Sequence, residues 1–366
     1  MKVIHVVRQF SPAIGGLENF VFDLVKAQLA QGIDATVVTL DKRFDSGQKL
    51  AAKETIQGIK IKRIPFIGSY KYPIAPKVLK AIRDADIVHV HAIDFFVDYL
   101  ALTQFIHKKP LVVSTHGGFF HTKFARHLKK IYFNTITRAS LTRSARIVAC
   151  SENDQRLFAA LDAKKTQLIE NGVNTIKFFS GSPNRAENQM LFIGRFSDNK
   201  RIDLLIKWFK ELVCLDASFR LVIAGKNWDN NLESLTNLVE DLKLTSNVHF
   251  KLEASEEELS ELVASSSFVV SASEYEGFGM TIIEGMAGGL IPVMSGIASF
   301  EKIHRSTGCG WIVDFEQPGS AKAWLAELHR KGDVLSLKQK SVKAAQRYSW
   351  PFVSQQFTQV YRQVLS

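Results

Sequence analysis

Short apolar runs recur along the whole chain, separated by longer segments in which apolar residues return every three or four positions. Short apolar runs bounded by glycine or polar residues are typical of strands buried on both faces, and the longer segments have the period of amphipathic helices. This alternation predicts an α/β fold with parallel sheets. The expected strands fall at 3–7, 35–40, 59–64, 87–91, 111–114, 147–149 and 167–169, and in a second series at 190–193, 219–224, 248–250, 268–271, 291–293 and 310–313.

The length and the two strand series predict two domains. A chain of 366 residues exceeds the size at which one hydrophobic core stops growing, and its apolar content of 46% is enough for two cores. Residues 175–188 are polar and contain Gly181 and Pro183, so we expect a linker there. The expected parts are therefore an N-terminal domain at 1–174, the linker, a C-terminal domain at 189–349 and an amphipathic helix at 350–366.

Several classes of protein are not favoured by the composition. The longest uncharged apolar run, 285–300, contains four glycines and Pro292 and is too short to span a membrane. Arg8 interrupts the first apolar run, so no signal peptide is expected before the first strand. The three cysteines are far apart and lack CxxC spacing, which favours a reducing cytoplasm over a disulfide frame or a zinc site.

The net charge of +11 is concentrated in the first half of the chain. Residues 1–175 carry 26 Lys and Arg against 14 Asp and Glu, and no acidic residue lies between Asp98 and Glu152. Segment 123–146 has the pattern of one basic amphipathic helix. Such a helix either contacts an anionic membrane surface or packs in a core with a solvated basic face. No nucleic-acid partner is expected, because no known binding module is recognisable.

The chain is organised around the turn that follows the expected strand 268–271. Its glycines lead into a helix whose free backbone N–H groups and positive dipole end suit an anion. Glu276 lies in the turn, and Glu284 is expected about two turns into the helix, on the crevice side. Backbone N–H donors that can bind a phosphate, beside carboxylates that can bind hydroxyl groups, suit a nucleotide sugar. An ordinary strand–helix crossover with surface glutamates has the same local pattern. The turn consists of Gly277, Phe278, Gly279 and Met280.

Two further segments are suited to phosphate. Gly15 and Gly16 lie between the first strand and an amphipathic helix. This glycine loop either lets a phosphate approach the backbone or is simply a tight turn. The segment is not the GxGxxG fingerprint, so a nicotinamide cofactor is disfavoured. Arg195 and Lys200 follow the first strand of the second series, where cations can meet a diphosphate, although surface solvation also explains them.

Three histidines and an acidic pair are candidates for chemistry. His116 leaves the carboxyl end of strand 111–114, the productive edge of a parallel sheet, which favours a functional role over a structural one. His89 and His91 share a strand face, but no third ligand is evident, so a metal role is not expected. The acidic pair at 84 and 86 precedes its strand and lies at the wrong edge for a metal-bound diphosphate.

Together these motifs resemble the family 4 retaining glycosyltransferases of the GT-B fold, along essentially the whole chain. Similarity is found in H-V-V-R-Q-F-S-P at 5–12 with its following glycines, N-G-V-N at 171–174 with Phe178, G-R-x-x-x-x-K at 194–200 and E-x7-E at 276–284. The opening segment is particularly similar to bacterial exopolysaccharide mannosyltransferases. The chain departs from the family at Arg201, where glycine is common, at Gly285, where alanine is usual, and at Leu252, which replaces a glycine near the base pocket.

The resemblance implies a role for each matching residue. Arg195 and Lys200 would hold the diphosphate, Glu284 the ribose hydroxyls, and Glu276 the donor sugar near its anomeric centre. His116 would hydrogen-bond the sugar, and Gly16 would let the backbone approach the phosphate. The resemblance also implies two Rossmann-like domains whose parallel sheets face each other across a cleft, with the C-terminal helix crossing back to the N-terminal domain.

The implied activity is transfer of a hexose with retention of configuration and without a metal cofactor. We expect mannose from GDP-mannose to reach a glycan or lipid-linked oligosaccharide acceptor in surface polysaccharide synthesis. The enzyme is expected to be cytoplasmic, and peripheral on the inner face of the cytoplasmic membrane if its basic surface binds lipid. Alternatives are a UDP-sugar-dependent transferase, a nucleotide-sugar 2-epimerase of the same architecture, and a non-catalytic basic binding protein.

Overall fold

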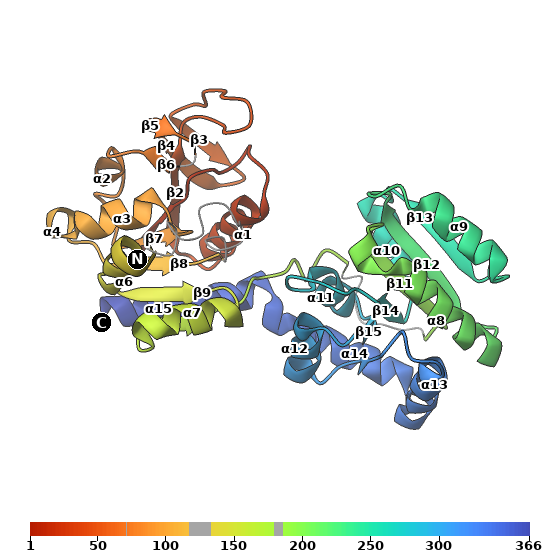
Figure 1. Cartoon of the computed structure of the whole chain (residues 1–366). Coiled ribbons are helices and arrows are strands. Elements are labelled where there is room, and N and C mark those ends of the chain that lie inside the picture. Colours follow the sequence, from red (N-terminus) through yellow and green to blue (C-terminus); the bar gives the residue numbers. More distant parts are fainter. Residues whose placement is uncertain (71, 117–132, 179–185) are drawn as a thin grey trace. The chain divides into compact units, whose positions relative to one another are not determined.

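The chain forms two units, each built on one sheet (Figure 1). Unit 1 comprises Met1–Gly172 and Trp350–Ser366, and unit 2 comprises Val173–Ser349. The computed structural model describes residues 1–70, 72–116, 133–178 and 186–366.

The sheet of unit 1 has eight strands in the order β10-β9-β8-β7-β1-β2-β4-β3, and only the pair β3–β4 is antiparallel. Strand order reverses beside β1, which is the feature of doubly wound sheets that places ligands at the carboxyl edge. The strands are β1 (Lys2–Val6), β2 (Asp34–Leu40), β3 (Lys53–Ile56), β4 (Ile59–Ile64), β7 (Ile87–His91), β8 (Leu111–Ser114), β9 (Arg146–Ala149) and β10 (Thr166–Leu168).

Three short strands of unit 1 were missed by the apolar pattern. β3 is almost wholly exposed, and β5 (Ile67–Ser69) and β6 (Tyr72–Ile74) form a separate exposed hairpin. Exposed strands bury no continuous apolar run, so the pattern that found the central strands is absent there.

Helices cover the unit 1 sheet, and one expected helix is shorter than predicted. Of the basic segment 123–146, residues 123–132 lie outside the described residues. Arg146 already belongs to β9, where it is paired with Val112, so the prediction of one helix to residue 146 was wrong. The helices are α1 (Gly16–Ala30), α2 (Val78–Ala81), α3 (Phe95–Leu102), α4 (Gln104–His107), the π-helix η1 (Phe133–Thr137), α6 (Arg138–Thr142), α7 (Glu152–Asp162) and α15 (Trp350–Leu365).

Unit 2 is a six-stranded, wholly parallel sheet in the order β13-β12-β11-β14-β15-β16. Every expected strand of the second series is present, with ends that differ from the prediction by no more than two residues. They are β11 (Gln189–Arg195), β12 (Arg220–Lys226), β13 (Val248–Leu252), β14 (Phe268–Ser271), β15 (Ile291–Met294) and β16 (Trp311–Ile312).

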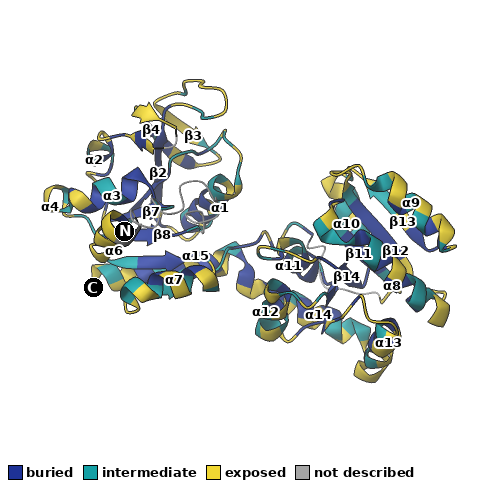
Figure 2. Cartoon of the chain, in the orientation of Figure 1, coloured by how far each residue is buried: buried dark blue, intermediate teal, exposed yellow. Residues whose placement is uncertain are grey.

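The helices of unit 2 bury one face each against this sheet, and Figure 2 shows buried strands beneath helices whose outer faces are exposed. No described helix is both long enough and apolar enough to cross a bilayer. The helices are η2 (Asp198–Lys200), α8 (Ile202–Leu215), α9 (Leu232–Asp241), α10 (Glu256–Ala264), α11 (Met280–Ala287), α12 (Ala298–Thr307), α13 (Ser320–Lys331), α14 (Val334–Ala345) and η3 (Gln346–Tyr348).

The segment that we expected to be the linker is only partly described. Phe178 is buried in the core of unit 2, so the start of the segment packs into that unit instead of spanning solvent. Residues 179–185 lie outside the described residues. Before them, Gly172 packs on the indole of Trp350, and a Cβ there would overlap the ring.

The C-terminal helix α15 packs in unit 1 beside α1 (Figure 1). Its buried face includes Phe357 and Tyr361, which lie in the same core as the first strand. Gln31 at the end of α1 donates a hydrogen bond to the Pro351 carbonyl at 2.8 Å. Residues that follow the whole of unit 2 in sequence thus complete the core of unit 1.

Candidate active site

The turn between β14 and α11 lies at the carboxyl edge of the unit 2 sheet. Met280 is the first residue of α11, and Gly279 is its N-cap with a left-handed φ of 85°. Glu284 is therefore about one turn into the helix, and the expectation of two turns was wrong because the turn extends to Gly279. Burial raises the pKa of Glu284, partly offset by the nearby charge of Lys177.

The two glycines of this turn have different surroundings. A Cβ on Gly279 would lie 2.9 Å from a methyl group of Ile303 and 3.1 Å from the ring of Phe300, in a backbone conformation that side chains rarely adopt. A Cβ on Gly277 would meet nothing within 4 Å. Only Gly279 is thus required by the fold, whereas Gly277 leaves open space beside Glu276. Phe278 is half-buried, and Met280 is exposed.

Lys200 and Glu276 form an ion pair, Nζ to Oε1, although they are 76 positions apart. Both side chains are mostly buried, with exposed fractions of 13% and 18%. Ser273 Oγ lies 3.4 Å from the same carboxylate oxygen. The expected diphosphate cation and the expected sugar carboxylate thus lie side by side at one edge of the sheet.

Asn199 ties the loop that carries Lys200 to the turn that carries Glu276. Its backbone carbonyl accepts from Glu274 N at 2.9 Å, and its side-chain amide donates to the Tyr275 carbonyl at 3.2 Å. Two hydrogen bonds therefore hold the loops in register. Nothing in the sequence pattern singled out Asn199, because its role depends on a neighbouring loop.

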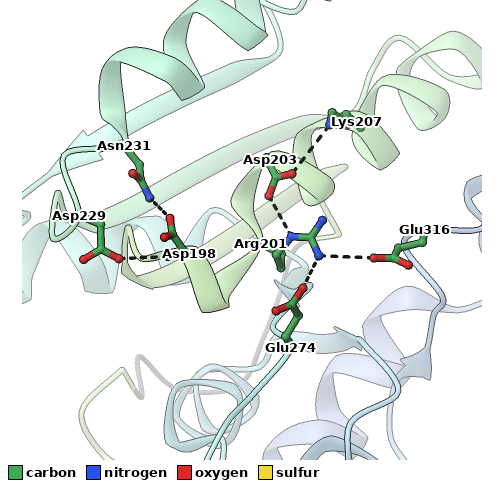
Figure 3. Close-up of polar contacts among 8 residues, drawn as sticks. All are labelled: Asp198, Arg201, Asp203, Lys207, Asp229, Asn231, Glu274 and Glu316. Carbon is green, nitrogen blue, oxygen red and sulfur yellow. Dashed lines mark hydrogen bonds and ion pairs between the residues drawn. The ribbon is translucent and has the colours of Figure 1, made fainter.

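The contacts of Arg201 account for the presence of arginine where the family commonly has glycine. Its φ of 47° is left-handed, the conformation that glycine adopts without strain. Its guanidinium forms ion pairs with Glu274, with Asp203 at 3.3 Å and with Glu316 at 3.4 Å (Figure 3). Arginine therefore supplies electrostatic contacts across three segments in place of glycine's conformational freedom.

Arg195 is the last residue of β11 and is exposed. Its guanidinium carbon lies 4.8 Å from the ring centroid of Trp228, a cation–π contact. Trp228 is 60% exposed, as is uncommon for so large an apolar side chain. Arg195 and Lys200 both lie at the carboxyl edge, with four residues between them along a loop.

Figure 3 also shows the contacts of Asp198, the first residue of η2, which ends at Lys200. Asp198 accepts from the side-chain amide of Asn231 at 2.9 Å, and its backbone N–H donates to Asp229 at 3.1 Å. These contacts join η2 to the loop that follows β12. The lysine therefore extends from a loop that is held from two directions, which preorganises its charge.

In unit 1, α1 begins at Gly16 with Gly15 as its N-cap. Gly16 has open space where a Cβ would lie, so a ligand could approach its backbone. The carboxylate of Glu18 lies against Gly15, so a side chain at position 15 would have to displace it. Sequence reasoning missed Glu18, although its place in the first turn of a helix after two glycines was a usable signal.

His116 follows β8 at the carboxyl edge of the unit 1 sheet and has a left-handed φ of 49°. A non-glycine residue in that region is uncommon and often marks a functional position. Its Nε2 lies 3.1 Å from His91 Nδ1, and its ring packs edge-on against Phe20. Burial lowers the pKa of His116 to about 3, so the imidazole is neutral.

The expectation that His89 and His91 have no third ligand nearby was wrong. His5 of β1 is paired in register with His89 of β7, and the three buried imidazoles offer nitrogens within 4.8 Å of one another. The sequence could not show this, because strand adjacency is decided by the sheet order.

The acidic pair at 84 and 86 has structural partners at the opposite edge of the sheet. Asp84 forms ion pairs with Lys2 and, at 3.6 Å, with Lys62. Asp86 accepts from the backbone N–H of Lys2 at 2.7 Å. Both carboxylates thus fix the start of β1.

Comparison with known proteins identifies the family of this chain. The model of the glycosyl transferases group 1 family matches residues 173–347, and that of glycosyltransferase family 4 matches residues 14–177. The chain is 40% identical over its full length to the GDP-mannose:cellobiosyl-diphosphopolyprenol alpha-mannosyltransferase of Xanthomonas oryzae pv. oryzae, covering 97% of that protein. Identity to the enzyme of the same name from Komagataeibacter xylinus is 36%, covering 94% of it.

The chain belongs to glycosyltransferase family 4, and it is a glycosyltransferase. Its fold is GT-B. A glycosyltransferase from Rickettsia africae has a TM-score of 0.72 at 19% identity, covering all of this chain and 98% of that one. Anabaena Alr3699/HepE in complex with UDP has a TM-score of 0.67 at 16% identity, covering 99% and 100%.

Of the other two departures from the family 4 pattern, the one at Gly285 has a local structural reason, and nothing in the structure explains the one at Leu252. A Cβ on Gly285 would lie 3.0 Å from Val269 on the adjacent strand, so the glycine allows α11 to pack closely on β14. Leu252 ends β13, is 42% exposed and has no left-handed φ; the left-handed residue is Glu253, which follows it.

Proposed function

We propose that this family 4 enzyme is an α-mannosyltransferase that moves mannose from GDP-mannose to a lipid-linked glycan in surface polysaccharide synthesis. The observation that supports it best is full-length similarity, at 36–40% identity, to enzymes named for this donor and for a diphosphopolyprenol acceptor. Every motif on which the proposed donor site rests lies within that match.

Departure of the nucleoside diphosphate is the step that the unit 2 residues would assist. Negative charge grows on the leaving diphosphate, and a preorganised cation stabilises it more than flexible water does. Lys200 is held by Glu276 and by a doubly anchored loop, and Arg195 lies on the same edge. The N-terminus of α11 adds a positive dipole end.

The carboxylates would bind hydroxyl groups. Glu276 can accept hydrogen bonds from the donor sugar and oppose the positive charge that develops at its anomeric carbon. Glu284 would bind the ribose hydroxyls, and Gly277, Phe278, Gly279 and Met280 would give the diphosphate its path along the turn. In unit 1, Gly16 and Gly15 would admit phosphate, and His116 would hydrogen-bond the sugar.

We also propose that transfer needs no metal cofactor, because lysine and arginine take the place that a divalent cation would hold at the diphosphate. Of the acidic pair that could otherwise bind a metal, Asp84 forms ion pairs with Lys2 and Lys62, and Asp86 accepts a hydrogen bond from the backbone of Lys2. Transfer should continue in excess EDTA at the rate found with Mg²⁺. Activity that is abolished by EDTA and restored by one divalent cation would refute this part.

Two experiments test the main proposal. Thermal unfolding with GDP, UDP and ADP identifies the base, and we expect GDP to give the largest stabilisation, since a ligand that binds only the folded state stabilises it. Incubation with GDP-mannose and a cellobiosyl-diphosphate lipid should then yield a mannosylated lipid. Stabilisation by UDP alone would favour the UDP-sugar alternative, and conversion of the donor without acceptor would favour the epimerase.

A membrane surface is proposed as the place where the enzyme meets its lipid-linked acceptor. Three large apolar side chains, Leu102, Phe105 and Ile106, are 58–75% exposed at the end of α3 and along α4. Lys108 and Lys109 follow immediately. Apolar side chains beside lysines are suited to the interface of an anionic bilayer. The protein would then be cytoplasmic and peripheral on the inner face of the membrane.

Vesicle flotation tests this surface. The protein should float with phosphatidylglycerol vesicles at low salt and less so at high salt, because surface charge is screened. Phe105→Ser with Ile106→Ser should lower the bound fraction, whereas Ile176→Ser in unit 2, at a residue exposed at least as much, should not. Failure to bind anionic vesicles at low salt would refute the membrane proposal and leave the transfer reaction untouched.

A further inference from the structure

A continuous series of buried hydrogen bonds runs through unit 1 to His116. Gln28 Oε1 lies 2.8 Å from His5 Nε2, His5 Nδ1 lies 3.0 Å from His91 Nε2, and His91 Nδ1 lies 3.1 Å from His116 Nε2. At the far end, His116 Nδ1 lies 3.6 Å from the sulfur of Cys150. The series joins α1, β1, β7 and the end of β8.

A second branch leaves Gln28 through its amide nitrogen. That nitrogen donates to the hydroxyl of Tyr361 at 3.1 Å, which lies 2.7 Å from His89 Nδ1. His89 Nε2 in turn lies 2.8 Å from Ser114 Oγ. The C-terminal helix, through Tyr361, thus helps to orient the amide from which the main series starts.

The position of each proton follows from the chemistry of Gln28. An amide oxygen only accepts, so the proton of neutral His5 is on Nε2 and its Nδ1 accepts. His91 must then donate through Nε2 and accept at Nδ1. The same rule makes His116 donate to His91 through Nε2, so its Nδ1 is left with a lone pair.

The groups along and at the end of the series support this direction. Burial raises the pKa of the Cys150 thiol to about 12, so sulfur keeps a proton that it can donate to His116 Nδ1. Burial also lowers the pKa of His5 to about 4 and holds the pKa of His91 far below its ordinary value. Each imidazole therefore carries one proton, which is what a series of single hydrogen bonds requires.

We propose that His91 is a positioning residue for His116, and that the series from Gln28 through His5 and His91 sets the tautomer and orientation of the His116 ring. The consequence is specific: Nδ1 of His116 is the nitrogen that can accept a hydrogen bond from a sugar hydroxyl, in exchange for the long contact with the thiol. This inference rests on the proposed contact between His116 and the donor sugar.

A metal ion held by His5, His89 and His91 is the competing interpretation of the same residues. Zinc would need a lone pair from each imidazole directed at one point. Two of the candidate nitrogens, His5 Nδ1 and His91 Nε2, instead share one proton at 3.0 Å, and both nitrogens of His89 already contact hydroxyl groups. The hydrogen-bonded series accounts for every ring nitrogen of these residues.

Two substitutions of similar size separate positioning from simple packing. His91→Asn keeps an acceptor near the place of Nδ1 and loses the bond to fully buried His5. His91→Gln puts a polar side-chain atom near the position of Nε2 and keeps the hydrogen bond to His5. It removes the acceptor for His116. We expect His91→Gln to lower kcat about 10- to 100-fold with little change in KM. His91→Asn should keep a larger share of kcat although it is the less stable protein, because it leaves the deeper group unpaired.

Tautomers are read directly from long-range ¹H–¹⁵N spectra of the full-length protein labelled in histidine. We expect His5, His91 and His116 each to carry one proton, on Nε2. Three outcomes would overturn the proposal: a proton on Nδ1 of any of them, activities of the two variants that follow their stabilities, or Zn²⁺ titration that moves the signals of His5, His89 and His91 together.

A failure of the proposed function is distinguishable from these outcomes. His116→Ala with undiminished transfer would refute the sugar contact of His116, whatever its tautomer. Reduced transfer by His116→Ala together with wild-type kcat in His91→Gln would refute positioning and leave the role of His116 intact.

Discussion

At the scale of single residues, the site depends on pairs that come from distant parts of the chain. Lys200 and Glu276 were each singled out from the sequence, as a cation and a carboxylate after different strands. The structure shows that the two side chains form an ion pair, so each orients the other. Because both side chains are largely buried, the pair is held in a fixed geometry and is less screened than an exposed pair would be.

Removing either partner should abolish transfer without unfolding the protein. Lys200→Ala and Glu276→Ala should each lower the transfer rate by about two to three orders of magnitude, because a preorganised charge is lost at the reacting bond. Lys207→Ala is the matched control, since Lys207 is exposed on α8 and its nearest carboxylate is 3.9 Å away. Transfer rates and circular dichroism would be measured for all three, and near-normal turnover in either site variant would contradict the assignment.

The buried histidines also make stability depend on pH. Burial holds the pKa of His5 at about 4, and the pKa values of His89 and His91 well below 6.5, so the unfolded chain takes up protons first as the pH falls. The contribution of these neutral imidazoles to the free energy of unfolding is fully present above about pH 6.5. It is lost as the pH falls toward 4.

Between pH 7 and pH 5, the lowered pKa of His5 should cost unit 1 about 2 kcal/mol, and the lowered pKa values of His89 and His91 should add to this loss. Denaturant unfolding at the two pH values measures the change, and hydrogen exchange assigns it to unit 1. His249→Gln, which alters an exposed histidine of unit 2, should leave the difference unchanged. Equal stability at pH 7 and pH 5 would show that the histidines are not held neutral.

At the scale of elements, the carboxyl edge of each sheet is shaped by the residues at which helices begin. Strand positions could be predicted because buried parallel strands are continuous apolar runs. The start of α11 could not be predicted, because the pattern of apolar and polar residues does not show where a glycine turn ends. Gly279 ends it: its left-handed φ and its contact with α12 leave no room for a side chain.

Alanine at the two glycines of this turn should therefore have different effects. Gly279→Ala should destabilise unit 2 by about 1–2 kcal/mol from the left-handed conformation alone, and its Cβ would also press on Ile303. Gly277→Ala should change stability by less than about 0.5 kcal/mol, since nothing lies near its Cβ. Urea unfolding of both variants tests this, and equal losses would mean that the turn is not constrained as described.

At the scale of the whole molecule, the C-terminal helix belongs to the first unit although the second unit precedes it in sequence. Phe357 of α15 is fully buried in the core that contains α1, and Tyr361 contacts Gln28. The chain end thus supports both the core of unit 1 and the histidine series beneath His116.

Truncation of one buried ring should show this dependence. Phe357→Ala should destabilise unit 1 by about 3–5 kcal/mol, as expected when a buried phenylalanine leaves a cavity. Phe352→Ala, on the same helix but 45% exposed, should cost well under half as much. Hydrogen exchange would localise the loss to unit 1, and a loss confined to unit 2 would contradict the placement of α15.

The sequence by itself determined the α/β class, the central strands, the family and the motif residues, because continuous apolar runs and short motifs are properties of neighbouring positions. Tertiary structure alone decided which distant residues meet. His5 joined His89 and His91 because β1 lies beside β7 in the sheet, and Lys200 joined Glu276 because β11 lies beside β14. Strand order and loop contacts arise from packing of the whole chain, which no local pattern records.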